Sequence, residues 1–454
     1  RFHLEKAIYL AKEGRPGPVW IDIPLDVQGA LVDPGILKGF RFTKRIIKIP
    51  GSQMEKLLKY FKVAKRPVIL AGQGIRIAGA IDDLLKLIET HKIPVVTTFL
   101  GVDLLDSNHP QNIGRIGIKG DRAGNLALQN ADLLLIIGTS LPVAEIGYEY
   151  AQFAREAKII IIDIDLSSHL KDAIRKNLLI RADAKDFIVK LSQGLKRIKK
   201  DFDKDWLTKC IAWKKRYPVC LPEYAKLKGK INIYYFIDRL CRKLTKKDAV
   251  VTDAGSAFYA GSQCVKIKEG ARYITSGGFA TMGYSLPASI GVSIALNNRR
   301  VMCITGDGSF QQNIQELQSV VHYQLPLKIF ILNNEGYLSI RFTQEKYFNK
   351  RFIGEGCCSG VSFPDAKKIA WAYGIKFFRV NENHKLDKIL GKVLNFPGPV
   401  ICEIMTPPNQ LIIPTVASER KPDGTMVSKP LEDMYPFLER KEFYENIIVK
   451  PLKE

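Results

Sequence analysis

Two short polar motifs follow neighbouring apolar runs in the second half of the chain. Gly306-Asp307-Gly308-Ser309 comes first and Asn333-Asn334 second, and 24 residues run from Ser309 to Leu332, the residue before the second motif. A carboxylate flanked by glycine leaves room for a phosphate and supplies a hard oxygen. An asparagine amide oxygen and a backbone carbonyl can complete the protein's share of a Mg²⁺ shell, and glycine lets backbone N–H groups reach phosphate oxygens. The pattern predicts a magnesium diphosphate site; the alternative is two ordinary strand-to-helix turns.

Short runs rich in β-branched residues are expected to form the strands that position these motifs. They alternate with helical stretches in two regions, residues 51–196 and 227–410. This rhythm favours parallel sheets covered by helices on both faces, and so an α/β fold with two Rossmann-like, doubly wound domains. The predicted strands are Pro67–Ala71, Pro94–Thr98, Leu133–Ile137 and Ile159–Ile164 in the first region, and Ala249–Thr252, Val301–Thr305, Lys328–Leu332 and Val400–Ile404 in the second.

The flanking segments have patterns of their own. A charged stretch from Leu195 to Lys209 predicts an exposed helical linker, and residues 411–454 form a tail after the second region. Pro-Gly-Pro-Val, a short apolar run, an acid and Pro occur at residues 16–24 and again at 397–407. Unless the similarity is a coincidence of turn residues, residues 1–35 are a stub of a third, related domain that ends in a short buried strand.

Composition limits the classes of protein and partner. The chain has 454 residues, 46% of them hydrophobic and 25% charged, which suits two to three globular domains. There is no apolar run of membrane-spanning length, and the eight cysteines are scattered without a C-x-x-C motif, so reduced thiols and a cytoplasmic location are expected. The net charge of +23 suits either a nucleic-acid partner or a lysine-rich solvated surface. Basic residues are spread along the chain, which favours the second and implies attraction of anionic substrates.

Over nearly its whole length the chain resembles the acetolactate synthase branch of thiamine diphosphate (ThDP) enzymes. The segments Thr275–Pro287 and Gly306–Leu317 carry this resemblance. It implies that residues 1–35 end a pyrimidine-binding domain, that 51–196 form the central domain, and that 227–410 form the domain that binds diphosphate and Mg²⁺. It also implies a homodimer or homotetramer, because such enzymes build each active site across two subunits.

The resemblance assigns roles residue by residue. Asp307, the side chain of Asn334 and the carbonyl of Gly336 would bind Mg²⁺. Ser256 stands where the family usually has glutamine, and it keeps a hydroxyl donor with a shorter reach. Met282 would support the bent cofactor, with core packing as the alternative. The implied cofactor-binding residues are Gly255, Ser256, Met282, Gly306, Asp307, Gly308, Ser309, Asn334, Gly336, Tyr337 and Leu338.

No catalytic residue is assigned within this sequence. The family's catalytic glutamate belongs to the pyrimidine-binding domain and is expected upstream of Arg1, so the chain alone is expected to be inactive. In the first region, Ser140 and Ala144 replace two arginines, one associated with FAD and one that clamps an acceptor carboxylate. Alanine cannot form a bidentate clamp. An acceptor other than a free 2-keto acid is therefore expected, and FAD binding stays open.

Further segments resemble ThDP enzymes of surface-polysaccharide gene clusters, namely Gly74–Ala80, Asn334–Arg341 and Ser428–Pro436. One type in that group transfers an acetyl unit from pyruvate to a nucleotide-linked keto-sugar, as in yersiniose formation. The expected function is therefore a ThDP- and Mg²⁺-dependent carboligase with a 2-keto acid donor and such an acceptor, without a nucleic-acid or membrane partner. The alternatives are acetolactate synthase of branched-chain amino-acid synthesis, a ThDP decarboxylase, or an inactive truncated remnant.

Overall fold

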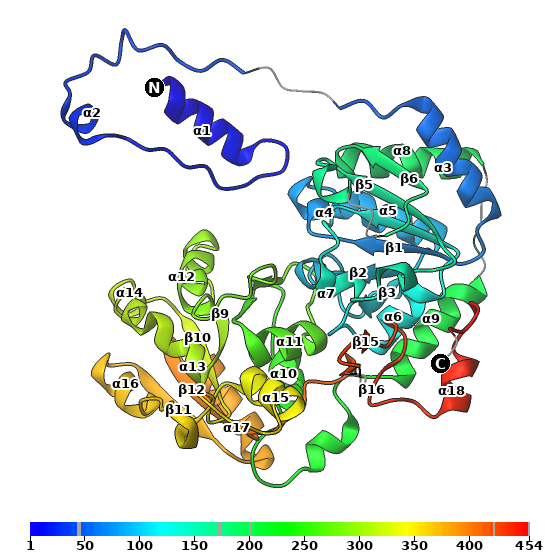
Figure 1. Cartoon of the computed structure of the whole chain (residues 1–454). Helices are drawn as coiled ribbons and strands as arrows, with labels where there is room; N and C mark the ends of the chain where they lie inside the picture. Colours follow the sequence, from blue (N-terminus) through cyan, green and yellow to red (C-terminus); the bar gives the residue numbers. More distant parts are fainter. Residues whose placement is uncertain (43–46, 171–173, 199–201, 203, 421–422, 453–454) are drawn as a thin grey trace.

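The computed structural model describes residues 1–42, 47–170, 174–198, 202, 204–420 and 423–452. Within them, two six-stranded parallel sheets form the centres of two α/β units, which confirms the predicted fold class (Figure 1). The first sheet contains β1 (Pro67–Ala71), β2 (Val95–Thr97), β3 (Asn112–Arg115), β4 (Leu133–Ile137), β5 (Lys158–Asp163) and β6 (Leu178–Arg181). The second contains β7 (Ala249–Thr252), β8 (Arg272–Thr275), β9 (Val301–Gly306), β10 (Leu327–Asn333), β11 (Lys376–Val380) and β12 (Val400–Met405). Their spatial orders are β3-β2-β1-β4-β5-β6 and β11-β12-β10-β9-β7-β8.

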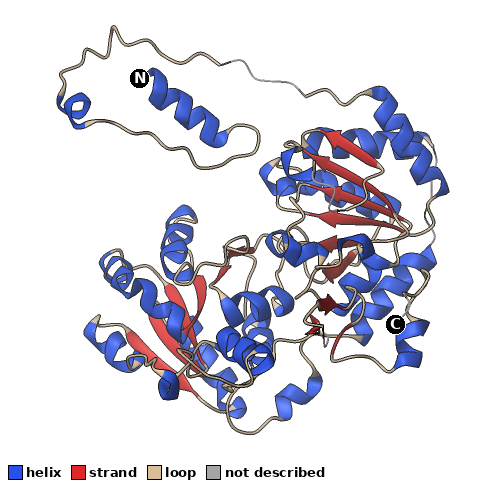
Figure 2. Cartoon of the chain, in the orientation of Figure 1, coloured by secondary structure: helices blue, strands red, loops and turns tan. Residues whose placement is uncertain are grey.

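Helices cover both faces of each sheet (Figure 2). Those of the N-terminal segment and first unit are α1 (Phe2–Lys12), α2 (Leu25–Gly29), α3 (Gly51–Val63), α4 (Gly74–Ile77), α5 (Ile81–His91), α6 (Arg122–Gln129), α7 (Val143–Ile146), α8 (Ala184–Arg197) and α9 (Lys204–Arg216). Those of the second unit and tail are α10 (Ile233–Arg242), α11 (Gly255–Cys264), α12 (Ser285–Ala295), α13 (Asp307–Phe310), α14 (Leu317–His322), α15 (Leu338–Tyr347), α16 (Ala366–Ala372), α17 (Asn383–Asn395) and α18 (Arg440–Glu445).

The central strands are apolar at every position because both faces of each sheet are buried. In β4, Leu133, Leu135 and Ile137 pack into one apolar cluster, and Leu134 and Ile136 pack into the cluster on the opposite face. None of these five side chains is more than 1% exposed. Successive side chains of a strand point to opposite faces, so a continuous apolar run is what a doubly covered sheet requires.

All eight predicted strands are present, with ends within about one residue of those expected. The sequence patterns did not predict β3, β6, β8 and β11. Each of these four is the outermost strand of its sheet. An edge strand has one neighbour instead of two and needs less apolar side-chain surface, so its pattern is weaker.

Two expectations for the flanking segments were wrong. The predicted buried strand near residues 19–24 is irregular and exposed, and the side chain of Trp20 is 92% exposed. No strand pairs with it among the described residues, and a parallel strand forms only beside a partner. Most of residues 1–42 run outside both α/β units in Figure 1, and Arg15 approaches the first unit through an ion pair with Asp165 at 3.6 Å.

Where the structure describes it, the stretch from Leu195 to Lys209 is largely helical as predicted, within α8 and α9, but it is not an exposed linker. Residues 199–201 and 203 lie outside the described residues. Leu195 is fully buried in α8, and Trp206, Cys210 and Trp213 are buried in α9. These three residues recur at helical spacing and form one apolar face of α9, which packs against α6 and β3. The many lysine and aspartate residues around these apolar positions led to the prediction of an exposed segment.

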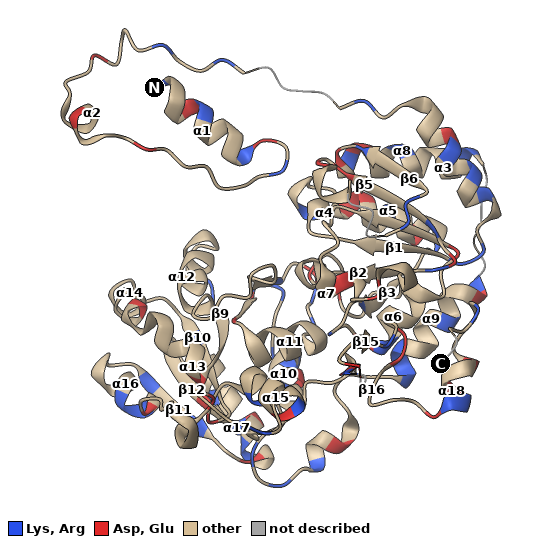
Figure 3. Cartoon of the chain, viewed as in Figure 1, with Lys and Arg blue, Asp and Glu red and all other residues tan. Residues whose placement is uncertain are grey.

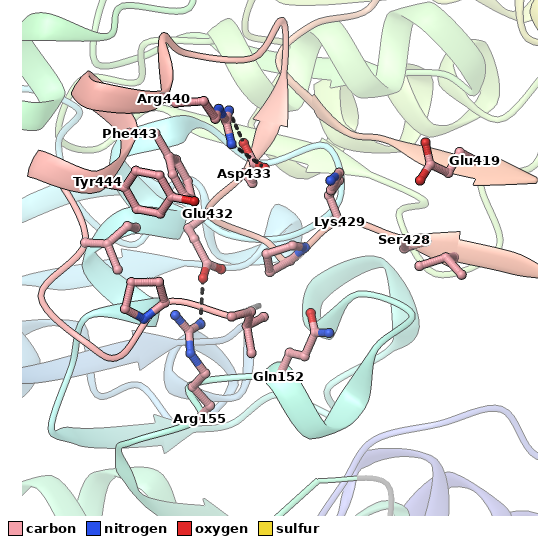
Figure 4. Close-up of a pocket in the computed structure, with 15 residues that line it drawn as sticks. Gln152, Arg155, Glu419, Ser428, Lys429, Glu432, Asp433, Arg440, Phe443 and Tyr444 are labelled. Carbon is pink, nitrogen blue, oxygen red and sulfur yellow. Dashed lines mark hydrogen bonds and ion pairs between the residues drawn. The ribbon is translucent and has the colours of Figure 1, made fainter. Parts of the chain in front are cut away.

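The tail turns back from the second unit and docks on the first. It contains the short strands β13 (Thr415–Val416), β14 (Ser418–Arg420), β15 (Met426–Ser428) and β16 (Met434–Tyr435), followed by α18. Leu431 and Met434 join the apolar cluster beneath α6 and α9. The Glu432 carboxylate accepts a hydrogen bond from Arg155 at 2.6 Å, beside a cavity of about 400 Å³ (Figure 4). It also accepts one from the side chain of Gln129 at 2.6 Å. The tail is therefore an integral part of the first unit's core.

The surface and thiols agree with the composition. Lys and Arg residues are spread over the helices of both units, interspersed with Asp and Glu (Figure 3). All eight cysteines are free thiols. Among the described residues, none of the helices combines the length and the apolar character needed to cross a membrane.

We predict that Glu432→Ala loosens the tail. The side chains of Arg155 and Glu432 are 11% and 2% exposed, and removing one partner of a buried pair leaves the other charge uncompensated, at a cost of about 3 kcal/mol. Urea unfolding should show this loss, and limited proteolysis should cut faster between residues 411 and 440. Glu419→Ala is the control, because Glu419 lines the same cavity but makes no ion pair within the described residues. Equal stability and equal cleavage of the two variants would contradict the proposed anchoring.

Candidate active site

The two polar motifs meet at the carboxyl ends of β9 and β10. The strands pair so that Gly306 lies beside Leu332, which brings Asp307 to the loop that begins at Asn334. One carboxylate oxygen of Asp307 accepts a hydrogen bond from the N–H of Gly308 at 2.8 Å. The other accepts from the N–H groups of Asn334 and Gly336, each at 3.2 Å. The predicted metal-binding residues are therefore adjacent.

The charges and vacant hydrogen-bonding atoms at this point fit a cation. Asp307 is 7% exposed and makes no ion pair with any described residue, and burial raises its pKa to about 6. The side-chain oxygen of Asn334 is buried and has no hydrogen-bond partner in the described part of the chain. Unpaired buried polar groups are costly. A divalent ion bound by the Asp307 carboxylate, the Asn334 amide oxygen and a backbone carbonyl would satisfy both groups.

Among the described residues there is no cluster of three or more His, Cys, Asp or Glu side chains that could hold a metal ion. A magnesium diphosphate needs no such cluster, because phosphate oxygens supply much of the coordination shell. The residues present therefore fit a metal bound together with a diphosphate better than a metal held by protein side chains alone.

Two glycines in these motifs are required by close packing. Gly336 has a φ of +151°, and a Cβ there would lie 2.1 Å from the carbonyl oxygen of Glu355. A Cβ on Gly308 would lie 2.3 Å from the ring of Tyr337. Side chains at these positions would push apart the two loops that surround Asp307, so both glycines serve the geometry of the site.

An ion pair that was not predicted from the sequence holds the second loop in place. Arg341 pairs with Glu355, and its guanidinium also donates to the carbonyls of Asn334 at 3.3 Å and Glu335 at 3.0 Å. The Glu355 carbonyl in turn accepts from the N–H of Tyr337 at 2.7 Å. Arg341 ends a segment noted for its resemblance, but no local signal connects Glu355 to the site, since the contact depends on the tertiary fold.

Helix N-termini surround the same region. Gly255 begins α11 with a φ of +58°, and a Cβ there would lie 3.8 Å from the hydroxyl of Ser339 in the first turn of α15. Ser256 in α11, Ser309 in α13 and Leu338 in α15 are buried, and each lies in the first turn of its helix. Exposed N–H groups at the start of a helix favour an anion. The predicted diphosphate contacts thus come from three helix starts.

Asp253 holds the segment that carries Met282. Its carboxylate accepts from the N–H of Gly283 at 3.0 Å, and from the N–H and hydroxyl of Ser285 at 2.9 and 2.6 Å. The side chain of Asn313 donates to the Gly283 carbonyl at 2.8 Å. Met282 is half-buried beside these anchors. The position of Asp253, immediately after β7, was the signal that could have revealed its role.

Gly72 and Gly74, in the turn that follows β1, are required by close packing. The N–H of Gly74 donates to the carbonyl of Gly138 at 2.9 Å, and a Cβ on Gly72 would lie 2.2 Å from that oxygen. The turn after β1 thus lies directly against the turn after β4. The acid after β5, Asp165, accepts from the N–H and hydroxyl of Ser167 at 3.0 and 2.9 Å, so it stabilises a turn.

Comparison with known proteins identifies the family. Residues 253–404 match the model for the C-terminal TPP binding domain of thiamine pyrophosphate enzymes, and residues 54–191 match the model for their central domain. This chain belongs to the thiamine pyrophosphate enzymes. It is 32% identical to the acetolactate synthase large subunit of Cyanidium caldarium over 424 residues, which cover 91% of this chain and 71% of that protein.

Other relatives have similar names. A probable acetolactate synthase large subunit from Methanococcus aeolicus is 33% identical, with 89% of this chain and 70% of the relative covered. The large subunit of acetolactate synthase isozyme 1 of Escherichia coli is 28% identical, with 91% and 71% covered. The chain is thus a thiamine pyrophosphate enzyme similar to acetolactate synthase large subunits.

Glu145, next to Ala144 in the first unit, gives a pH-dependent prediction. It is 5% exposed, its carboxylate accepts from the hydroxyl of Thr139 at 2.8 Å, and burial raises its pKa from 4.5 to about 7. A raised pKa means that the folded state holds the proton more tightly. Stability is therefore lost as pH rises from about 4.5 through about 7, at roughly 1.4 kcal/mol per pKa unit.

We predict that Glu145→Gln matches the natural protein in stability near pH 4.5 and exceeds it by about 3 kcal/mol at pH 8. The free energy of unfolding in urea, measured from pH 5 to 8, tests this. Asp165→Asn removes an acid whose side chain is 40% exposed. This variant is the control, with no comparable gain at high pH. A stability difference between Glu145→Gln and the natural protein that does not change with pH would refute the assignment.

Proposed function

We propose that this enzyme binds thiamine diphosphate and Mg²⁺ at the ends of β9 and β10 and acts as a carboligase. Asp307, the Asn334 side chain and the Gly336 carbonyl would bind the metal. The observation that supports this most directly is the buried, unpaired carboxylate of Asp307 beside the unpartnered amide oxygen of Asn334. The remaining cofactor contacts would come from Gly255, Ser256, Met282, Gly306, Gly308, Ser309, Tyr337 and Leu338.

When bound, thiamine diphosphate supplies a nucleophilic carbon and an electron sink, which allow a 2-keto acid to lose CO₂ and its acyl unit to pass to an acceptor carbonyl. The chain's own residues bind and orient. The helix N-termini at Gly255 and Leu338 would hold the diphosphate. Asp253 would fix the segment of Met282, and Met282 would support the cofactor. Arg341 and Glu355 keep the loop of Asn334 and Gly336 in position. We infer a homodimer or homotetramer, as in the family.

The acceptor that we propose is a nucleotide-linked keto-sugar. Ala144 and Leu338 both line a cavity of about 830 Å³ between the two units. Such a volume is far larger than a second 2-keto acid requires, and typical sites for drug-sized ligands have 300–1,000 Å³. An alanine also offers no charge to an acceptor carboxylate. The second candidate is acetolactate synthase itself, which the names of the relatives favour.

We predict that Asp307→Asn lowers the affinity for Mg²⁺-thiamine diphosphate by on the order of 100-fold, because the charged ligand is lost from the metal shell. Isothermal titration of the cofactor, with and without Mg²⁺, measures the change. Glu335→Gln removes a charge from the same loop, but Glu335 is exposed and pairs with Lys230, so its affinity should be unchanged. If Asp307→Asn binds like the natural protein, the site is wrongly placed.

The acceptor can be tested by product analysis. The protein, supplied with Mg²⁺ and thiamine diphosphate, is incubated with pyruvate alone and then with pyruvate and a CDP-linked keto-sugar. We predict CO₂ release and a branched, acetylated sugar nucleotide in the second mixture, with little acetolactate in the first, because Ala144 cannot clamp a second pyruvate. Efficient acetolactate formation from pyruvate alone would instead support the acetolactate synthase candidate.

A further inference from the structure

The large cavity between the units has walls from three parts of the chain. Phe99 and Tyr148 come from the first unit, Tyr259 and Leu338 from the second, and Tyr435 from the tail. Its volume is about 830 Å³. Leu338 also belongs to the predicted diphosphate contacts, so the cavity begins where the cofactor site ends. A molecule bound here would contact Leu338, one of the predicted cofactor contacts.

Two lysine side chains line this largely apolar and aromatic space. The ammonium of Lys119 donates to the carbonyl of Ile412 at 3.0 Å and lies 5.9 Å from the ring centre of Tyr259. The ammonium of Lys346 donates to the carbonyl of Ser418 at 2.5 Å. Neither lysine pairs with a carboxylate among the described residues. Each therefore has donor capacity left, because an ammonium group has three N–H donors.

The local charge balance favours an anion. The acid among the lining residues is Glu345, whose carboxylate lies 3.8 Å from Lys350, an exposed lysine outside the cavity lining. Burial, and to a smaller extent the nearby charge of Lys346, together lower the pKa of Lys119 to about 8. Lys119 is half-buried and Lys346 is exposed at the cavity wall. Two like charges that line one cavity repel each other unless a counter-ion lies between them.

We propose that this cavity binds an acceptor that carries a phosphate or diphosphate group, with Lys119 and Lys346 as the cationic contacts of that group. The acceptor role rests on the proposed carboligase function, whereas the anion site itself rests on the cavity and its two lysines.

Size and charge both favour a phosphorylated sugar or nucleotide over a second 2-keto acid. A 2-keto acid such as pyruvate carries one negative charge and fills a small part of the cavity, whereas a diphosphate carries enough charge for two ammonium groups. Lysine binds phosphate as a point charge. The rings of Tyr148, Tyr259 and Tyr435 offer flat surfaces with hydroxyl groups, which suit a sugar or a nucleobase.

Direct binding of UDP tests the proposal independently of turnover. Titration calorimetry is done on the 454-residue chain in buffer with EDTA and without Mg²⁺ or thiamine diphosphate, so that the metal site cannot capture the ligand. We expect UDP to bind, inorganic pyrophosphate to compete with it, and pyruvate not to compete. Lys119→Met and Lys346→Met should each weaken UDP binding by about tenfold or more, as expected for loss of a charge-assisted hydrogen bond.

Three controls make the result specific. Lys350→Met removes an exposed lysine just beyond the end of α15, the helix that carries Lys346. This variant should leave UDP affinity unchanged. Lys119→Arg keeps the charge and should retain most of the affinity, which separates loss of contact from misfolding. Asp307→Asn should still bind UDP, because its defect lies in the metal site.

Several outcomes would overturn the proposal. They are the absence of UDP binding to the natural chain, unchanged affinity in both methionine variants, or loss of UDP binding in Asp307→Asn, which would place UDP at the metal site. The two proposals also fail separately. A chain that binds UDP through the lysines but does not bind Mg²⁺-thiamine diphosphate refutes the carboligase function alone, and the reverse result refutes the acceptor site alone.

Discussion

The burial of one carboxylate governs the organisation of the second unit. Asp307 lies at the end of β9 without a cationic partner in the described chain, and backbone N–H groups from its own turn and from the Asn334 loop surround it. Even with these hydrogen bonds its pKa is raised to about 6, so the backbone compensates only part of the cost of burial. The strand register, the close approach at Gly336 and the Arg341 clamp all serve to keep this incompletely satisfied group in place.

The sequence predicted the centre of each sheet better than its edges. A central strand such as β4 is buried on both faces and paired on both sides. It therefore needs an apolar residue at every position, and a run of five such residues is enough to predict it. An outer strand such as β3, with the sequence Asn-Ile-Gly-Arg, has an open side and a mixed composition. The buried strand predicted near residues 19–24 shows the complementary limit. The residue pattern there suits a strand, but a strand forms only when a neighbouring strand provides the backbone hydrogen bonds.

The same distinction applies to the site. Residues predicted to touch metal or phosphate lie in short motifs whose residue types are dictated by that chemistry, and the structure brings Asp307, Asn334 and Gly336 together. The residues that position them lie elsewhere in the chain. Glu355 reaches the site from a loop and Asp253 acts from the end of β7, where many unrelated side chains would also suit the local pattern. Long-range contacts of this kind follow from the packing of the whole domain, which no local pattern encodes.

The two units are joined by buried polar contacts, and this makes the cavity between them a defined site. Arg115 of the first unit donates to the carbonyl of Gln263 at 3.2 Å, and the Gln263 side chain donates back to the carbonyl of Gly120 at 3.0 Å. Asp103 accepts from Arg272 at 2.8 Å across the same junction. Because breaking such bonds would leave buried groups unsatisfied, the units resist relative movement. Under the proposed function, the second unit would hold the cofactor. The cavity walls and charges contributed by the first unit and the tail would determine which acceptor can approach it.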